Sequence, residues 1–165
     1  KSFEEIEKNP KDTIVFDFEL NDRIEKTVAD KGADGKLLCS SGGDIYRVNL
    51  LEKILCSLLA KISNFIPEAG IWPNTQRPEW NDANNALVGH GLSMVTVYYI
   101  HRYLQFLKDF YGRQDLPEFE ISQETGEFFE SIHKVFTQFA GNLDKGFNDQ
   151  SRKEITGYIG VAGQT

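Results

Sequence analysis

Apolar residues recur at three- and four-residue intervals in two stretches of the chain, and this is the spacing of one helix face. In residues 48–65 they are Leu51, Ile54, Leu55, Leu58, Leu59, Ile62 and Phe65. In residues 122–140 they are Phe128, Phe129, Ile132, Val135, Phe136 and Phe139. Ser122 can cap the second of these helices by accepting backbone N–H groups of its first turn. We assign its aromatic stripe to the protein core.

A third apolar stretch, residues 84–110, carries its large side chains on more than one helix face. A helix that is apolar most of the way round is normally covered by neighbours on several sides, so we expect this one to be buried. Gly89 and Gly91 lower the helix propensity near its start. Such glycines usually allow close approach of another backbone or a ligand.

The two ends of the chain are less regular. Residues 2–8 suit a short helix that Asn9 and Pro10 would end. Residues 13–20 could form a strand, although a helix continuing through Ile24 and Val28 fits equally well. Residues 31–44 are rich in glycine and serine and are predicted to be a loop. A capping box formed by Ser151 and Glu154 would open a last helix.

These elements predict an all-α protein built from helical hairpins. We expect residues 1–165 to form one helical domain, with a less regular segment over residues 1–47. The architecture is either an arc of an (α/α)6 toroid or an up-down helix bundle. The broadly apolar helix over residues 84–110 favours the toroid, because an inner helix of a toroid has neighbours on both sides.

Composition narrows the range of partners. The 165 residues are 40% hydrophobic, which is enough for one sizeable core. The net charge is −7, so the chain is not expected to bind nucleic acid. No apolar run reaches the roughly 18 residues of a membrane-spanning helix, and no membrane partner is expected.

The chain opens on Lys1, so we expect a piece of a longer protein. The compartment is left open by the sequence, with a slight preference for the cytoplasm.

The residues that could bind a metal do not form a recognisable set. Cys39 and Cys56 have no metal-ligand spacing, and Cys56 lies among leucines, where we expect a buried free thiol. His90 and His101 lack acidic or cysteine partners at metal spacing, so structural hydrogen bonding is favoured for both. We therefore expect no metal and no cofactor. A substrate contact from His90 stays open, because it follows the polar segment described next.

Residues 77–85, Arg-Pro-Glu-Trp-Asn-Asp-Ala-Asn-Asn, form the densest group of polar recognition residues in the chain. Pro78 disfavours helical dihedrals at Arg77, which indicates that Glu79 ends a loop before a helix begins. Asp82 or Asn84 can cap that helix. Glu79 and Trp80 precede it, and an acid beside an indole is typical of sugar-binding clefts.

The segment Glu79-Trp-Asn-Asp-Ala-Asn-Asn85 resembles the Gly-Asp-Trp-Asn-Asp-Gly-Met-Asn segment of cellobiose phosphorylases and their relatives. These enzymes have an (α/α)6 barrel, and the acid before Trp-Asn-Asp protonates the glycosidic oxygen in an inverting reaction. The resemblance covers about 15 residues, against the roughly 40 of one helical hairpin. Pro78, Glu79 and Ala83 replace the family's Gly, Asp and Gly, so the acid is one methylene longer here.

The resemblance implies that the chain is part of a larger carbohydrate-active domain, a hydrolase or a phosphorylase, with Glu79 as general acid. Expected substrate-binding residues are Trp72, Arg77, Trp80, Asn81, Asp82, Asn85 and His90. The expected partners are an oligosaccharide, inorganic phosphate if the enzyme is a phosphorylase, and the rest of the parent chain. The alternative is a non-catalytic helical structural or interaction domain, in which Glu79 pairs with Arg77 and Trp80 packs on the core.

Overall fold

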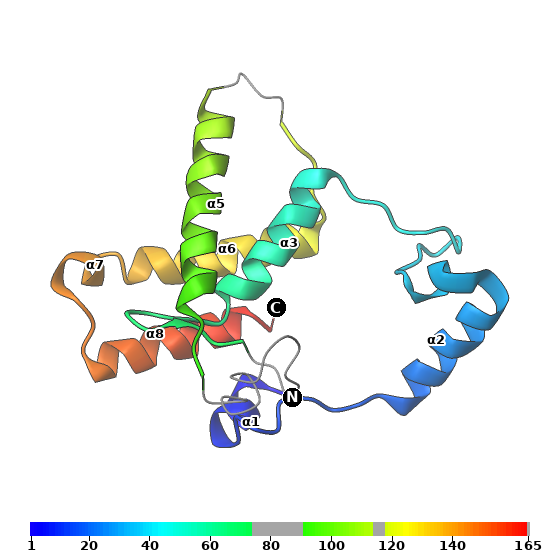
Figure 1. Ribbon diagram of the computed structural model, residues 1–165, viewed down its shortest axis with the longest axis horizontal. Coiled ribbons are helices and arrows are strands. Elements are labelled where there is room, and N and C mark those ends of the chain that lie inside the picture. The colour runs from blue at the N-terminus through cyan, green and yellow to red at the C-terminus, as the bar shows by residue number, and fades with distance from the viewer. Residues whose placement is uncertain (74–90, 114–117, 165) are drawn as a thin grey trace. The chain divides into compact units, whose positions relative to one another are not determined.

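The computed structural model describes residues 1–73, 91–113 and 118–164. Within these ranges the chain forms seven α-helices, one 3-10 helix and one two-stranded hairpin, which confirms the predicted all-α class (Figure 1). The chain divides into two compact units. The first comprises Lys1–Thr13 and Leu50–Thr165, and the second comprises Ile14–Asn49.

The smaller unit is built on helix α2 (Phe18–Lys31) and the 3-10 helix η1 (Gly32–Lys36). The Asp17 carboxylate caps α2 by accepting from the amide of Leu20 at 2.8 Å. The helical alternative is therefore correct from Phe18 through Val28, whereas residues 13–17 form neither a helix nor a strand. The 3-10 helix packs on α2, and Gly35 is buried at the contact. A Cβ at Gly35 would lie 2.6 Å from the backbone of Thr27, so only glycine permits this approach.

The larger unit contains the core. Leu59 of α3 (Leu50–Ile62) meets residues of α6 (Gln123–Gln138) and α8 (Asp149–Ala162) there. The buried members are Leu59, Ile132, Val135, Phe139, Ile155, Ile159 and Ala162. The short helix α7 (Asn142–Lys145) joins α6 to α8, which run in opposite directions in Figure 1 and pack together. This is a helical hairpin of the predicted kind, and the aromatic stripe of α6 contributes to the core as expected.

Helix α1 (Phe3–Lys8) confirms the predicted short helix and has a complete capping box between Ser2 and Glu5. It packs on α8 through Phe3. A Cβ at Gly160 would lie only 2.1 Å from the Phe3 ring. The glycine that weakens α8 as an isolated helix therefore makes room for α1.

A short hairpin follows α3, where the sequence predicts only a loop. Strand β1 (Phe65–Ile66) pairs antiparallel with β2 (Gly70–Ile71). Glu68 lies in the turn with a φ of 60°, an unusual value for a residue other than glycine. The side chain of Glu68 is held by contacts to α8 that are described below.

Helix α5 (Met94–Gly112) differs from its prediction in two ways. Of the predicted stretch 84–110, residues 84–90 lie outside the described part of the chain, while residues 91–93 are not helical. The Ser93 hydroxyl accepts from the amide of Thr96 at 3.2 Å and so caps the helix. The backbone of Ser93 is extended because it pairs with Ile71.

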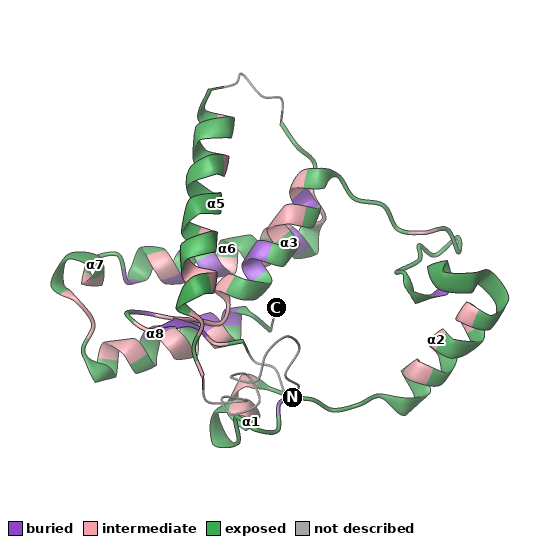
Figure 2. Ribbon diagram, viewed as in Figure 1, coloured by how far each residue is buried: buried purple, intermediate pink, exposed green. Residues whose placement is uncertain are grey.

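The expected burial of α5 is wrong as well. Figure 2 shows the helix as mostly exposed, and none of its residues is buried. Tyr98, Tyr99 and Phe106 are each 58–65% exposed. Sequence periodicity reveals that a helix is apolar on several faces, but it cannot reveal which partners are present to cover those faces.

Two local predictions need correction. Helix α8 begins after Asn148, whose carboxamide oxygen accepts from the amide of Ser151 at 2.8 Å, so Ser151 lies in the first turn and is not the cap. Asparagine is among the best capping residues, and here it acts three residues earlier.

Cys56 is free but exposed, with its sulfur 3.4 Å from the Thr125 hydroxyl. One residue along a helix turns the side chain by about 100°, which takes Cys56 away from the face of Leu55.

No helix in the described ranges has both the length and the apolar character needed to cross a bilayer.

Candidate functional site

One predicted site residue, Trp72, lies within the described ranges. The proposed acid Glu79 lies outside them, and so do six predicted substrate-binding residues, Arg77, Trp80, Asn81, Asp82, Asn85 and His90. Their assignments stay predictions. The structure describes the residues that directly precede and follow the segment carrying them.

The flanking residues form a β-bridge between Ile71 and Ser93. The amide of Ile71 donates to the carbonyl of Ser93 at 3.2 Å, and the amide of Ser93 donates to the carbonyl of Ile71 at 2.7 Å. Ile71 is buried, and Gly70 has a φ of 151°. A Cβ at Gly70 would lie 3.2 Å from the Ser93 backbone. The two ends of the segment that carries the motif are therefore held side by side.

Trp72 is fixed directly after this bridge. Its amide donates to the carbonyl of Asn64 at 2.9 Å, which ties it to the end of α3. The indole is half-buried and borders a hollow of about 560 Å³ between α1, β1 and α8. We call this hollow the Trp72 groove. Its lining residues are Phe3, Ile6, Glu7, Pro10, Ile66, Trp72, Leu92, Asp149, Arg152, Lys153, Thr156 and Gly157.

Trp72 also borders a smaller hollow of about 220 Å³. Phe3, Ile6, Ile66 and Thr156 line both hollows, so the two adjoin around the indole. The combined concavity lies beside the residues that flank the Ile71–Ser93 bridge, since Leu92 is in the lining as well.

Charged side chains of opposite sign line the groove in pairs. The Lys153 ammonium lies 3.7 Å from the Glu7 carboxylate and joins α8 to α1. The Arg152 guanidinium lies 2.9 Å from the Asp149 carboxylate one turn earlier on α8. Glu7 and Lys153 are more than half exposed. The Glu7–Lys153 pair thus offers a donor and acceptors to a ligand and carries no net charge.

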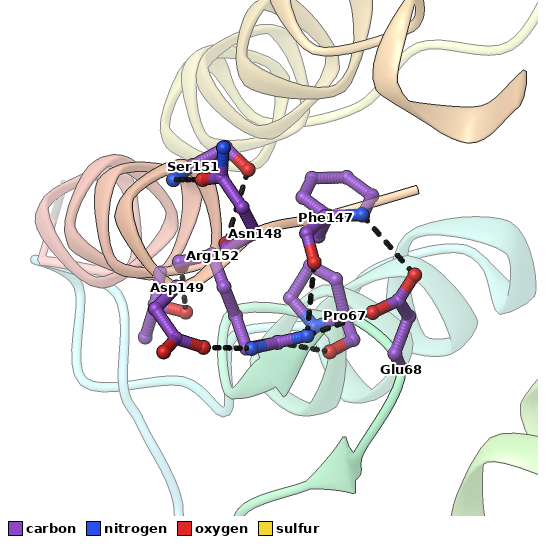
Figure 3. Close-up of polar contacts among 8 residues, drawn as sticks. Pro67, Glu68, Phe147, Asn148, Asp149, Ser151 and Arg152 are labelled. Carbon is purple, nitrogen blue, oxygen red and sulfur yellow. Dashed lines mark hydrogen bonds and ion pairs between the residues drawn. The ribbon is translucent and has the colours of Figure 1, made fainter. Parts of the chain in front are cut away.

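Arg152 also fixes the wall of the groove (Figure 3). Its Nε donates to the carbonyl of Pro67 at 3.2 Å, and its Nη2 donates to the carboxylate of Glu68 at 2.7 Å and the carbonyl of Phe147 at 3.1 Å. Glu68 accepts a further bond from the amide of Phe147 at 3.2 Å. These bonds attach the β1–β2 turn to α8, and Trp72 follows directly after that hairpin.

The same bonds decide the protonation of Glu68. The amide of Phe147 and then the Arg152 guanidinium stabilise its charged form and lower the pKa of Glu68, against a small opposing effect of burial. Glu68 is therefore ionised at neutral pH and acts as an acceptor. It is unsuited to donate a proton to a leaving group.

A second polar cluster joins α3 to the start of α6. Glu52 is 5% exposed and accepts from the Thr125 hydroxyl at 3.2 Å. A hydrogen bond from Ser122 lowers the pKa of Glu52, which outweighs the effect of burial. Its position by the first turn of α6 favours the anion further. Within the described ranges, the pKa is lowered in each carboxyl group that departs from its ordinary value, namely Glu5, Glu52 and Glu68. None of these three carboxyl groups is therefore suited to act as a general acid.

The two histidines that the structure describes lie beside apolar side chains. His101 and His133 border a cavity of about 410 Å³ whose other lining residues are aliphatic or phenylalanine side chains of α3, α5, α6 and the hairpin. The His133 ring stacks on Phe129 with centroids 6.1 Å apart. In the described part of the chain no three His, Cys, Asp or Glu side chains are grouped as a metal would require.

Sequence reasoning missed the charged residues of the groove. Glu7 and Lys153 stand at opposite ends of the chain, and the network of Glu68 with Arg152 joins residues 84 positions apart. Phe3 and Ile6, three residues apart on one helix face, indicate that α1 docks on something. Nothing in the spacing identifies α8 as that surface.

No protein-family model matches the sequence, and no curated protein is detectably similar to it.

Proposed function

We propose that this chain is part of a carbohydrate-active domain that cleaves glycosidic bonds with inversion, as a hydrolase or a phosphorylase. Glu79 is the general acid of this proposal. The observation that carries it is the segment Glu79-Trp80-Asn81-Asp82, with its likeness to the motif of cellobiose phosphorylases.

The residues that flank this segment in the described fold support the proposal. The bridge between Ile71 and Ser93 brings the segment's two ends together, and Trp72 and Leu92 beside it line a groove. A catalytic loop has to be anchored on rigid elements near the surface that binds its substrate. This anchoring meets that requirement without itself specifying the chemistry.

In the proposed reaction, Glu79 is protonated and donates its proton to the glycosidic oxygen as the bond to the anomeric carbon breaks. An apolar setting provided by Trp80 would keep the carboxyl neutral by disfavouring its charged form. Water or phosphate attacks the opposite face of the sugar. Asp82 bonds a sugar hydroxyl or caps a helix, while the remaining polar residues of the segment, Arg77, Asn81, Asn85 and His90, bind hydroxyl groups.

The proposed larger domain is an (α/α)6 toroid completed by the rest of the parent chain. Such a ring repeats an antiparallel helical hairpin, and the α6–α8 hairpin is compatible with that repeat. The exposed aromatic side chains of α5 favour further helices packed against it, because exposed apolar patches of this extent commonly mark an interface. The same exposure also suits the second candidate, a non-catalytic helical module that binds a protein partner through α5.

The test uses the parent protein and a panel of oligosaccharides, with and without inorganic phosphate. Replacing Glu79 with Gln keeps the side-chain size but removes the proton donor. We expect cleavage to fall at least about 100-fold, in line with general acid catalysis, while the circular dichroism spectrum is unchanged. A matched Glu124→Gln variant on the exposed start of α6 should cleave normally. Cleavage by Glu79→Gln at the wild-type rate would eliminate Glu79 as the acid. Absence of cleavage by the unaltered parent protein would favour the non-catalytic module instead.

A further inference from the structure

We propose that the Trp72 groove is a binding subsite for a neutral pyranose unit of the oligosaccharide, separate from the reacting bond. This inference rests on the proposed function for the class of ligand. It adds residues of α1 and α8 to a site that the sequence locates only in residues 72–90.

The first argument is the shape and lining of the groove. A hollow of about 560 Å³ lies within the roughly 300–1,000 Å³ typical of small-molecule sites. One wall is the half-buried indole of Trp72, with Phe3 and Ile66 beside it. Flat aromatic rings beside polar groups suit sugars, because the C–H faces of a pyranose pack on the ring while its hydroxyl groups bond at the edges.

The second argument is the charge of the polar lining. Glu7 pairs with Lys153, and Arg152 faces both Asp149 and Glu68, so these groups provide no excess of positive charge. A phosphate or a nucleotide would be favoured by an excess of positive charge, which these pairs do not supply. A neutral polyhydroxyl ligand can instead bond to the carboxylates as acceptors and to the Lys153 ammonium as a donor.

The third argument is preorganisation. Arg152 is held by Pro67, Glu68 and Phe147, and these bonds keep α8 and the β1–β2 hairpin in register. The wall that carries Trp72 is therefore set before a ligand arrives, which lowers the entropic cost of binding. In this proposal the subsite binds a sugar unit and takes no part in the proton transfer. Such remote binding energy can raise the efficiency of cleavage elsewhere on the same substrate.

The test is a titration of the isotope-labelled chain with cellobiose, followed by amide and indole resonances. We expect the Trp72 indole N–H and the amides of Glu7 and Lys153 to shift together, with a dissociation constant on the order of 1 mM, about −4 kcal/mol. Inorganic phosphate at the same concentration should leave them unmoved. Shifts with phosphate and none with cellobiose would overturn the assignment to a neutral sugar.

Variants separate specific binding from general surface effects. Trp72→Ala should weaken binding at least about tenfold, whereas Trp72→Phe should keep part of it, because a smaller ring still covers a sugar face. Lys153→Ala should weaken binding with little effect on folding. It therefore tests the subsite even if the Trp72 variants fail to fold. The control is Lys134→Ala, an exposed lysine on α6 in a similar pair with Glu130. If the Lys153 and Lys134 variants bind cellobiose with equal affinity, a role for Lys153 in sugar binding is refuted.

The outcome can be distinguished from that of the catalytic test. If Glu79→Gln cleaves normally while cellobiose still shifts the groove residues, the acid assignment fails and the subsite stands. If Glu79→Gln loses activity while cellobiose moves no groove residue, the catalytic proposal stands and the subsite is refuted.

Discussion

Ile159 lies at the centre of the core that holds α8 in place, and its replacement by alanine tests the fold beneath the groove. Its side chain is 0% exposed and belongs to the cluster with Ile132, Val135 and Ile155. Ile→Ala removes three carbon groups, each worth about 0.8 kcal/mol when buried. The cavity left behind adds to this, and measured costs of such changes are about 2–5 kcal/mol.

We therefore expect Ile159→Ala to lower the free energy of unfolding by about 3 kcal/mol, in the middle of that range. For a chain of this size, this corresponds to a fall of about 10 °C in the melting temperature. Urea unfolding followed by circular dichroism should show a lower midpoint with an unchanged slope, because the surface exposed on unfolding is nearly the same.

The matched control is Val161→Ala, two residues further along the same helix. Val161 is 58% exposed, so its truncation should change stability by no more than about 0.5 kcal/mol. The two variants share the helix and a similar change in propensity and differ chiefly in burial. If Ile159→Ala costs no more than Val161→Ala, the packing of α8 on α3 and α6 described above is incorrect.

Three further predictions concern α8 and the turn attached to it. The Phe147 amide helps to lower the pKa of Glu68, so wild type should be more stable than Glu68→Gln above the unfolded carboxyl pKa of about 4.3. The difference in stability should vanish as the pH falls through the lower pKa that Glu68 has in the folded protein. An equal difference in urea midpoint at pH 7 and pH 3 would contradict this prediction. Gly160→Ala should release α1, seen as faster proteolysis of the N-terminus, because the new Cβ would collide with the Phe3 ring. Phe3→Ala removes the same contact, so adding Gly160→Ala to it should cause little further increase in proteolysis. Gly157→Ala, whose Cβ meets nothing within 4 Å, should instead raise stability by up to about 1 kcal/mol.

Local patterns along the chain determine its helices, and the structure confirms most of them. The apolar spacing in residues 48–65 and 122–140 predicts α3 and α6, and Ser122 caps α6 as expected. These features depend on residues three or four apart, so the information needed to predict them is local. The all-α class follows from the same patterns.

Contacts between distant residues decide the rest. Ser93 pairs with Ile71 across the chain, so α5 begins later than its apolar pattern suggests. The hairpin turn at Glu68 is attached to α8 by Arg152, 84 residues further along. Neither contact has a periodic signal, because each depends on how separate elements approach one another in space.

The sequence by itself determined the helical class, the main core positions and the motif around Glu79. Only the tertiary structure decided that α1 and α8 meet beside Trp72 and that α5 is exposed. The physical reason is that propensity and periodicity are properties of neighbours along the chain, whereas burial and the lining of a groove depend on which surfaces pack together.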